Sequence, residues 1–78
     1  MTFDPVVAYR ILREKQDRLY LQAGMMRWEA IYDMVSERIT RDEERRLCAI
    51  ADKITDEADN MYRVLEYLRE RIDKEQES

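Results

Sequence analysis

The chain has 78 residues, of which 41% are charged and 45% hydrophobic, and its formal net charge is −4. It contains one Cys, one Gly, one Pro and no His, which excludes a disulfide framework, a multi-cysteine or histidine zinc site, a His-dependent nucleophile and a Gly-rich phosphate loop. Because it has almost none of the turn residues that β-hairpins need, no signal-peptide pattern and no apolar run of ~20 residues, we expect one soluble, cytoplasmic, all-α domain over residues 1–78, without cofactor, metal or membrane contact.

The first helix is expected over residues 5–38. Asp4 is a good N-cap, and Pro5 suits the first helical turn, where its missing N–H needs no partner. Gly24 interrupts this segment, but no Ser, Thr, Asp or Asn stands beside it to cap a new helix. We therefore expect a continuous helix, because one Gly costs only about 1 kcal/mol. The alternative is a three-helix bundle with a break at Gly24.

The second helix is expected over residues 41–75. Thr40 and Glu43 form a capping-box pattern, in which each side chain can bond the backbone N–H of the other residue. Residues 75–78 are a polar tail that we expect to fray. The two segments together predict an antiparallel two-helix hairpin.

Apolar residues of the second helix recur at alternating spacings of four and three, which is typical of coiled-coil packing. They are Leu47, Ala51, Ile54, Ala58, Met61, Leu65, Leu68 and Ile72. The first helix has a row at the same spacing, with two charged interruptions: Val7, Ile11, Glu14, Arg18, Leu21, Met25, Trp28, Tyr32, Val35 and Ile39. We expect the two rows to face each other, with Trp28 opposite Ala51 and Leu21 opposite Ala58. Where Glu14 and Arg18 interrupt the row, we expect the contact to rotate onto Leu12 and Leu19, although a buried Glu14–Arg18 ion pair is the alternative.

A further apolar row predicts contact with a second chain, because two helices share one seam and a lone hairpin rarely offsets its ordering entropy. In the first helix this row is Leu12, Leu19, Ala23, Met26, Ala30 and Met34. We expect a homodimeric four-helix bundle; a three-helix monomer, a higher oligomer and a chain that orders on a partner are the alternatives. The candidate core and dimer residues are Leu12, Leu19, Met26, Trp28, Met34, Ile50, Ile54, Met61, Leu65 and Leu68.

The charges are concentrated in the second half of the chain. Residues 1–39 carry six basic and six acidic side chains, whereas residues 40–78 carry eight basic and twelve acidic ones. An acidic face is expected along the second helix, at Asp52, Asp56, Asp59, Glu66 and Glu70. Candidate partner-binding residues on the first helix are Tyr9, Arg13, Tyr20 and Arg27. Nucleic-acid binding is not expected, because phosphate contacts need local positive charge.

Two short strings resemble known families. Asp42-Glu43, Cys48 and Ala58-Asp59-Asn60-Met61-Tyr62-Arg63 are similar to the Rop-like plasmid RNA-binding hairpins, over about a quarter of the chain. This resemblance implies a helical hairpin that binds RNA or DNA. The family's RNA-binding face lies on its first helix, where this chain has no comparable string, so no functional residue is carried over.

The second resemblance is to the MazG-type nucleotide pyrophosphatases. Asp56-Glu57-Ala58-Asp59, followed by Val64-Leu65-Glu66-Tyr67-Leu68, looks like the second acidic helix of those enzymes. The resemblance implies an Mg²⁺ site whose first motif would be Glu29, Asp33 and Glu37, although these residues are spaced by four rather than three.

No other group of residues supports catalysis. We expect a non-enzymatic protein-binding module: a small adaptor, regulator or inhibitor that presents helical faces to a larger protein, of the kind that phages and mobile elements carry. A Rop-like nucleic-acid binder and an Mg²⁺-dependent pyrophosphatase are the alternatives.

Overall fold

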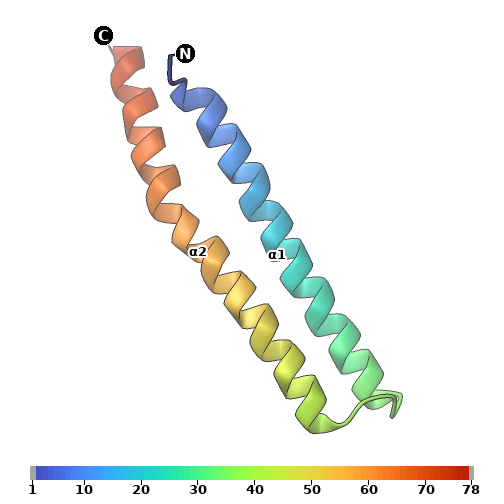
Figure 1. Cartoon of the computed structure of the whole chain (residues 1–78). Helices are drawn as coiled ribbons and strands as arrows, with labels where there is room; N and C mark the ends of the chain where they lie inside the picture. Colours follow the sequence, from blue (N-terminus) through green and yellow to red (C-terminus); the bar gives the residue numbers. More distant parts are fainter. Residues whose placement is uncertain (1, 78) are drawn as a thin grey trace.

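In a computed structural model that describes residues 2–77, the chain is an antiparallel hairpin of two long helices, α1 (Pro5–Val35) and α2 (Arg41–Glu77). The hairpin is 60 Å long and 21 by 15 Å across, and both chain ends lie together at the end opposite the loop (Figure 1). This confirms the all-α hairpin. Helix α1 runs without a break through Gly24, so the three-helix alternative is wrong.

Helix α1 begins where the sequence predicts. The Asp4 carboxylate accepts hydrogen bonds from the backbone N–H groups of Val6, at 2.9 Å, and Val7, at 3.4 Å. Pro5 occupies the first helical position. The two bonds satisfy N–H groups that have no partner inside the helix, which fixes the start of α1.

Helix α1 ends at Val35, three residues before the expected residue 38. Glu37 adopts a left-handed backbone conformation with φ of 61°. Its N–H bonds the carbonyl of Met34 at 3.1 Å, and the N–H of Arg38 bonds the carbonyl of Asp33 at 2.8 Å. These two bonds form the Schellman motif that terminates helices. The sequence does not predict this helix end, because the residue in the left-handed conformation is Glu instead of the usual Gly.

Helix α2 starts with the predicted capping box. The N–H of Glu43 bonds Oγ1 of Thr40 at 3.2 Å, and the N–H of Thr40 bonds Oε1 of Glu43 at 3.5 Å. Helix α2 then continues to Glu77, so residues 75–77 of the expected frayed tail are helical. Ser78 lies outside the described residues.

The predicted row of α2 is the one that packs against α1. Ala51 and Ala58 are completely buried, and Leu65 and Leu68 are 4% and 3% exposed. The other members, Leu47, Ile54, Met61 and Ile72, are half-buried. The predicted α2 row therefore contacts α1 along the whole length of the hairpin.

The predicted row of α1 is wrong. Helix α1 packs through Ala23 and Ala30, each 1% exposed, with Leu12, Leu19, Met26 and Met34 half-buried beside them. Trp28, expected in the core, is 75% exposed, and Leu21 is 65% exposed. The row assigned to a second chain is thus the intramolecular seam, and the expected seam points away from α2.

The reason is steric. Rows two residues apart lie on nearly opposite sides of a helix with 3.6 residues per turn. Small Ala side chains on both helices allow the backbones to approach closely, whereas a row containing Leu and Trp would hold them apart. The register is close to the expected one. Tyr20 pairs with Asp59 and Arg27 with Asp52, and both pairs have residue numbers that sum to 79, whereas the buried bond joins Gln16 and Ala58, whose numbers sum to 74. The main difference from the expectation is the rotation of α1 about its axis.

Glu14 and Arg18 are both exposed, while Leu12 and Leu19 are half-buried. The contact runs through Leu12 and Leu19 at this point, but the expected rotation does not occur there, because the same α1 row packs on α2 along the whole helix. Within the single hairpin, Glu14 and Arg18 form no buried ion pair.

Candidate functional site

The most unusual surface of the hairpin is an apolar row on the side of α1 that faces away from α2, which we call the outer stripe. Its apolar members are Val7, Ile11, Leu21, Met25, Trp28, Tyr32 and Val35, at spacings of four and three except where Glu14 and Arg18 occupy the row between Ile11 and Leu21. All are exposed, from 47% for Val7 to 75% for Trp28. From Leu21 to Val35 the row exposes apolar side chains at every position, and extended exposed apolar surface is typical of sites where proteins associate.

The stripe is denser toward the loop. Leu21, Met25 and Trp28 follow one another without a polar interruption, and Tyr32 and Val35 complete this part. The guanidinium of Arg38 lies 5.8 Å from the centre of the Tyr32 ring, a cation–π contact that restricts one end of the stripe. Trp and Tyr are the residues most enriched at the energetic centres of protein interfaces.

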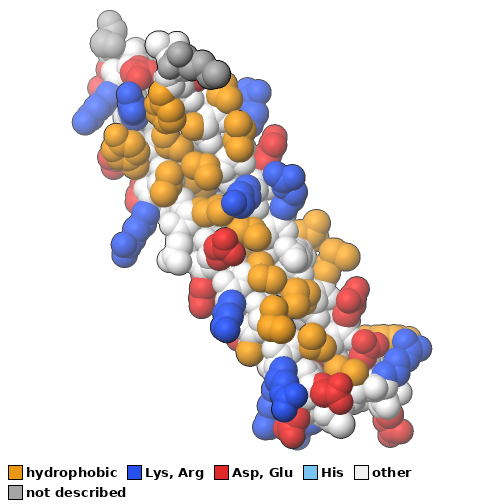
Figure 2. All heavy atoms as spheres, in the orientation of Figure 1, with side chains coloured by type: hydrophobic (Ala, Val, Ile, Leu, Met, Phe, Trp, Pro, Cys, Tyr) orange, Lys and Arg blue, Asp and Glu red, His pale blue; other side chains and the backbone are white. Residues whose placement is uncertain are grey.

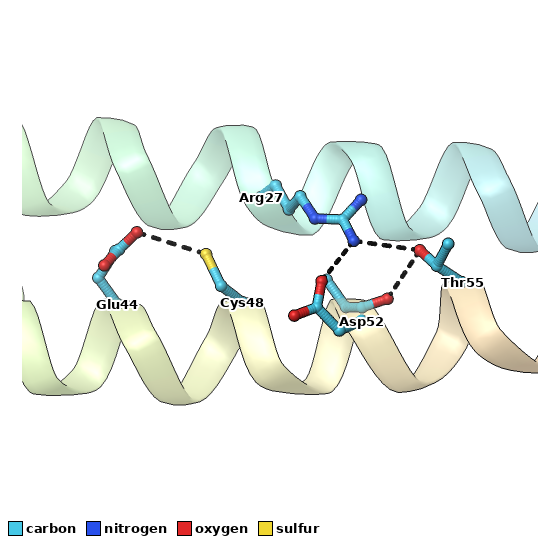
Figure 3. Close-up of polar contacts among 6 residues, drawn as sticks. Arg27, Glu44, Cys48, Asp52 and Thr55 are labelled. Atoms are coloured by element: carbon cyan, nitrogen blue, oxygen red, sulfur yellow. Dashed lines mark hydrogen bonds and ion pairs between the residues drawn. The ribbon is translucent and has the colours of Figure 1, made fainter.

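A second surface, the polar edge, follows one side of the line where α1 and α2 meet. Arg27 of α1 reaches across to α2, where its Nη2 lies 2.6 Å from an Asp52 carboxylate oxygen and 3.2 Å from Oγ1 of Thr55 (Figure 3). Thr55 in turn donates to the carbonyl of Ala51 at 3.0 Å. Two turns further along, Tyr20 donates its phenolic hydrogen to Asp59. These bonds connect α1 to α2 along this edge.

Two of the four predicted partner-binding residues, Tyr20 and Arg27, are therefore engaged within the hairpin. The hydrogen bond to Asp59 is the main reason why the pKa of Tyr20 lies well above its ordinary value, since ionising the phenol would place two negative charges together. At the same edge, partial burial and then the contact with Glu44, at 3.4 Å, raise the pKa of the Cys48 thiol (Figure 3). A raised pKa disfavours the thiolate, which is the nucleophilic form of a cysteine side chain.

The other two candidates, Tyr9 and Arg13, line a shallow groove of about 390 Å³ toward the chain ends. Its remaining walls are Tyr62, Leu65, Glu66 and Arg69 of α2. Arg13 lies 3.9 Å from Asp17 in an exposed ion pair. The groove combines both signs of charge with two aromatic rings, and this mixture does not define a single class of ligand.

The third surface is the apolar edge, on the opposite side of the same line between the helices. Because the polar contacts fix how each helix is turned, helical spacing places Leu19 and Met26 of α1 and Ile50, Met61 and Val64 of α2 along it. Ile50 and Val64 are 47% and 48% exposed, and the other three are half-buried. Figure 2 shows hydrophobic side chains as a band between the helices, broken by single charges.

The predicted acidic face is exposed on α2, at Asp52, Asp56, Asp59, Glu66 and Glu70. The charge of Asp52 is compensated by Arg27, and Asp59 accepts a hydrogen bond from the uncharged Tyr20 phenol. Within residues 2–77, no three His, Cys, Asp or Glu side chains converge closely enough to hold a metal ion. The Mg²⁺ site implied by the pyrophosphatase resemblance is not assembled there.

One buried polar residue was not predicted. Gln16 is 1% exposed within the contact between α1 and α2, which we call the alanine seam after Ala23, Ala30, Ala51 and Ala58. Its Nε2 donates to the backbone carbonyl of Ala58 at 3.0 Å. Its position in the α1 seam row, midway between Leu12 and Leu19, is the signal that could have identified it. The hydrogen bond of Gln16 joins the middle of α1 to the middle of α2.

Comparisons with known proteins give no relative. No protein-family model, no curated protein and no solved structure matches the chain. Among the described residues, neither helix is long and apolar enough to cross a membrane.

Proposed function

We propose that the chain is a non-enzymatic protein-binding module whose outer stripe packs against an apolar surface of another protein chain. The observation that carries this proposal is the exposure of Leu21, Met25 and Trp28 at 65%, 55% and 75% in one uninterrupted row. Burying apolar surface is the main favourable contribution to association, and an exposed Trp between aliphatic residues is a typical interface anchor.

In this role the protein is a small cytoplasmic adaptor, regulator or inhibitor of the kind that phages and mobile elements carry. Its rigid helices hold the stripe ready for binding, so little ordering entropy opposes the association. A Rop-like RNA-binding function is less well supported. The net charge is −4, and Arg27 of α1 is already bound to Asp52.

A small core supports an assembly larger than one hairpin. In the part of the chain that the structure describes, the buried hydrophobic residues of the seam are four alanines and two leucines. Alanine burial contributes little, because the hydrophobic stabilisation scales with the apolar area removed from water. We therefore propose that the protein works as a homodimer of four helices, with a larger protein as a further partner.

The proposal is tested by affinity purification from the native host with three baits. These are the wild type, a Met25→Ser/Trp28→Ser variant, and a matched control, Tyr67→Ser, which removes a side chain of α2 that is 60% exposed. We expect the wild type and the control to retain the same partner and the stripe variant to lose it, with all three equally helical by circular dichroism. Equal retention by the stripe variant would contradict the proposal.

A further inference from the structure

We infer that the chain on which the outer stripe packs is a second copy of this protein, with the two α1 helices antiparallel and the helices in the order α2–α1–α1–α2. The inference rests on the proposed function and names the partner of the same surface. It differs from a square four-helix bundle, because the stripe lies on the side of α1 opposite its alanine seam with α2.

The stripe is complementary to itself in one antiparallel register. In this register Ile11 faces Val35 of the partner subunit, and Leu21 faces Met25 of the partner subunit. These four side chains are between 55% and 71% exposed in the single hairpin. The twofold symmetry repeats every contact, so the stripe from Ile11 to Val35 is covered along its length.

The same register explains the two charged residues inside the stripe. It places Arg18 opposite Trp28 of the partner subunit, where a guanidinium can lie over the indole face. It places Glu14 opposite Tyr32 of the partner subunit, whose phenol can donate to the carboxylate. Both charged residues are exposed in the single hairpin and have apolar neighbours in the row. They would therefore fix the register, as polar residues do in coiled-coil seams.

The charges along α1 favour the antiparallel direction. Residues 10–18 hold four basic and two acidic side chains, whereas residues 29–37 hold three acidic side chains and no basic one. Antiparallel pairing brings each basic segment beside the acidic segment of the other copy. Parallel pairing would place like charges together, which costs free energy.

The symmetry has a consequence for a larger partner. In this dimer the four helices lie side by side in one layer, and the twofold axis runs perpendicular to that layer. The symmetry therefore places the same edge of both copies on the same face of the layer. The two apolar edges, which contain Ile50 and Val64, would then lie on one face of the dimer. The two polar edges, which contain Arg27 and Asp52, would lie on the other face. A further partner would meet the apolar face.

Disulfide trapping tests the pairing. In a Cys48→Ser background, Ile11→Cys and Val35→Cys are made as separate proteins and oxidised alone and as a mixture. We expect a disulfide-linked heterodimer in the mixture and little linkage in either protein alone, because residues 11 and 35 are roughly 36 Å apart along one helix. Ile50→Cys in the same background is the control for packing through the apolar edge.

Light scattering at low micromolar concentration accompanies the trapping. We expect a dimer for the wild type and a helical monomer for Trp28→Glu. Linkage of Ile11→Cys to itself would show parallel pairing, and linkage at Ile50→Cys alone would show pairing through the apolar edge; either result overturns the inference. A wild-type monomer that still binds a host protein through its stripe would also overturn it, while leaving the proposed function intact.

Discussion

At the scale of single residues, Gln16 is the most informative polar group. Its side chain is buried at the seam, and its amide donates to the carbonyl of Ala58 at 3.0 Å. This bond links residues that are 42 positions apart in the chain. Because a buried donor without a partner is costly, Gln16 specifies how α1 is placed on α2.

Gln16→Glu tests this role. A carboxylate facing the Ala58 carbonyl would be buried without a donor, so we expect a loss of roughly 3 kcal/mol in the free energy of unfolding at neutral pH. Burial raises the pKa of such a group above the ordinary value of about 4.3. Since the protonated acid can donate to the carbonyl, stability should recover as the pH falls through the raised pKa.

Urea denaturation at neutral and acidic pH measures the effect, with Gln16→Met as the uncharged control. The control should lose about 1 kcal/mol at both pH values, because it removes the hydrogen bond without adding a charge. A Gln16→Glu protein as stable as the wild type at neutral pH would show that the side chain is not held in the seam.

Tyr20 provides a test of the polar edge. Its pKa in the folded state is raised above 10.0, chiefly by the hydrogen bond to Asp59. The bond therefore stabilises the folded state below pH 10.0, and this contribution is lost as the pH rises through the folded-state pKa of Tyr20. In an absorbance titration of the five tyrosines, we expect one to ionise later than the rest. Asp59→Asn should move that step to lower pH, and an unchanged titration would contradict the Tyr20–Asp59 contact.

At the scale of the helices, the two elements differ in how much their sequences reveal. Helix α2 has one continuous apolar row, so the sequence predicted its packing face correctly. Helix α1 is apolar on two opposite sides, with Ala23 and Ala30 on one and Leu21 and Trp28 on the other. Hydrophobic spacing cannot choose between two such rows. The choice depends on how closely the backbones approach, which is a tertiary property.

The caps and the register could also be predicted, because they depend on local chemistry. Asp4, Thr40 and Glu43 each bond the backbone groups that their positions imply. The end of α1 could not be predicted, because Glu37 is not a residue that favours a left-handed backbone. The polar contacts of Arg27 and Tyr20 were missed as well, since they follow from the rotation of α1.

Gly24→Ala tests the continuity of α1. A Cβ at this position would meet no neighbouring atom within 4 Å, and the residue lies inside the helix. Alanine should therefore stabilise the protein by about 0.5–1 kcal/mol, because it restricts the unfolded chain without a clash. Thermal unfolding monitored by circular dichroism gives the measurement, and destabilisation would indicate that the helix is interrupted here.

Glu37→Gly tests the end of α1. Glycine adopts the left-handed conformation at Glu37 without steric cost, so we expect a gain of about 0.5–1 kcal/mol in the free energy of unfolding. Ser36→Gly is the matched control, because Ser36 has an ordinary φ of −81° and should lose stability on substitution. Equal effects of the two substitutions in urea denaturation would contradict the loop conformation.

At the scale of the whole molecule, different surfaces of the hairpin make different contacts. The alanine seam and the polar edge hold α1 to α2, while the outer stripe and the apolar edge remain available for other chains. Composition and charge predicted the class of fold, and two apolar rows were recognised on α1. The sequence could not show which of the two rows packs on α2 and which remains exposed, because this depends on the rotation of α1 about its axis.

The sole tryptophan, Trp28, allows the most direct test, because its emission reports whether the outer stripe faces water or α2. At the highest dilution that keeps the protein helical, we expect the emission of a hydrated indole that a soluble quencher reaches freely. As the concentration rises, the emission should shift to the blue with the same midpoint as the increase in mass. Blue-shifted, quencher-protected emission from the monomer would place Trp28 against α2 and contradict the account.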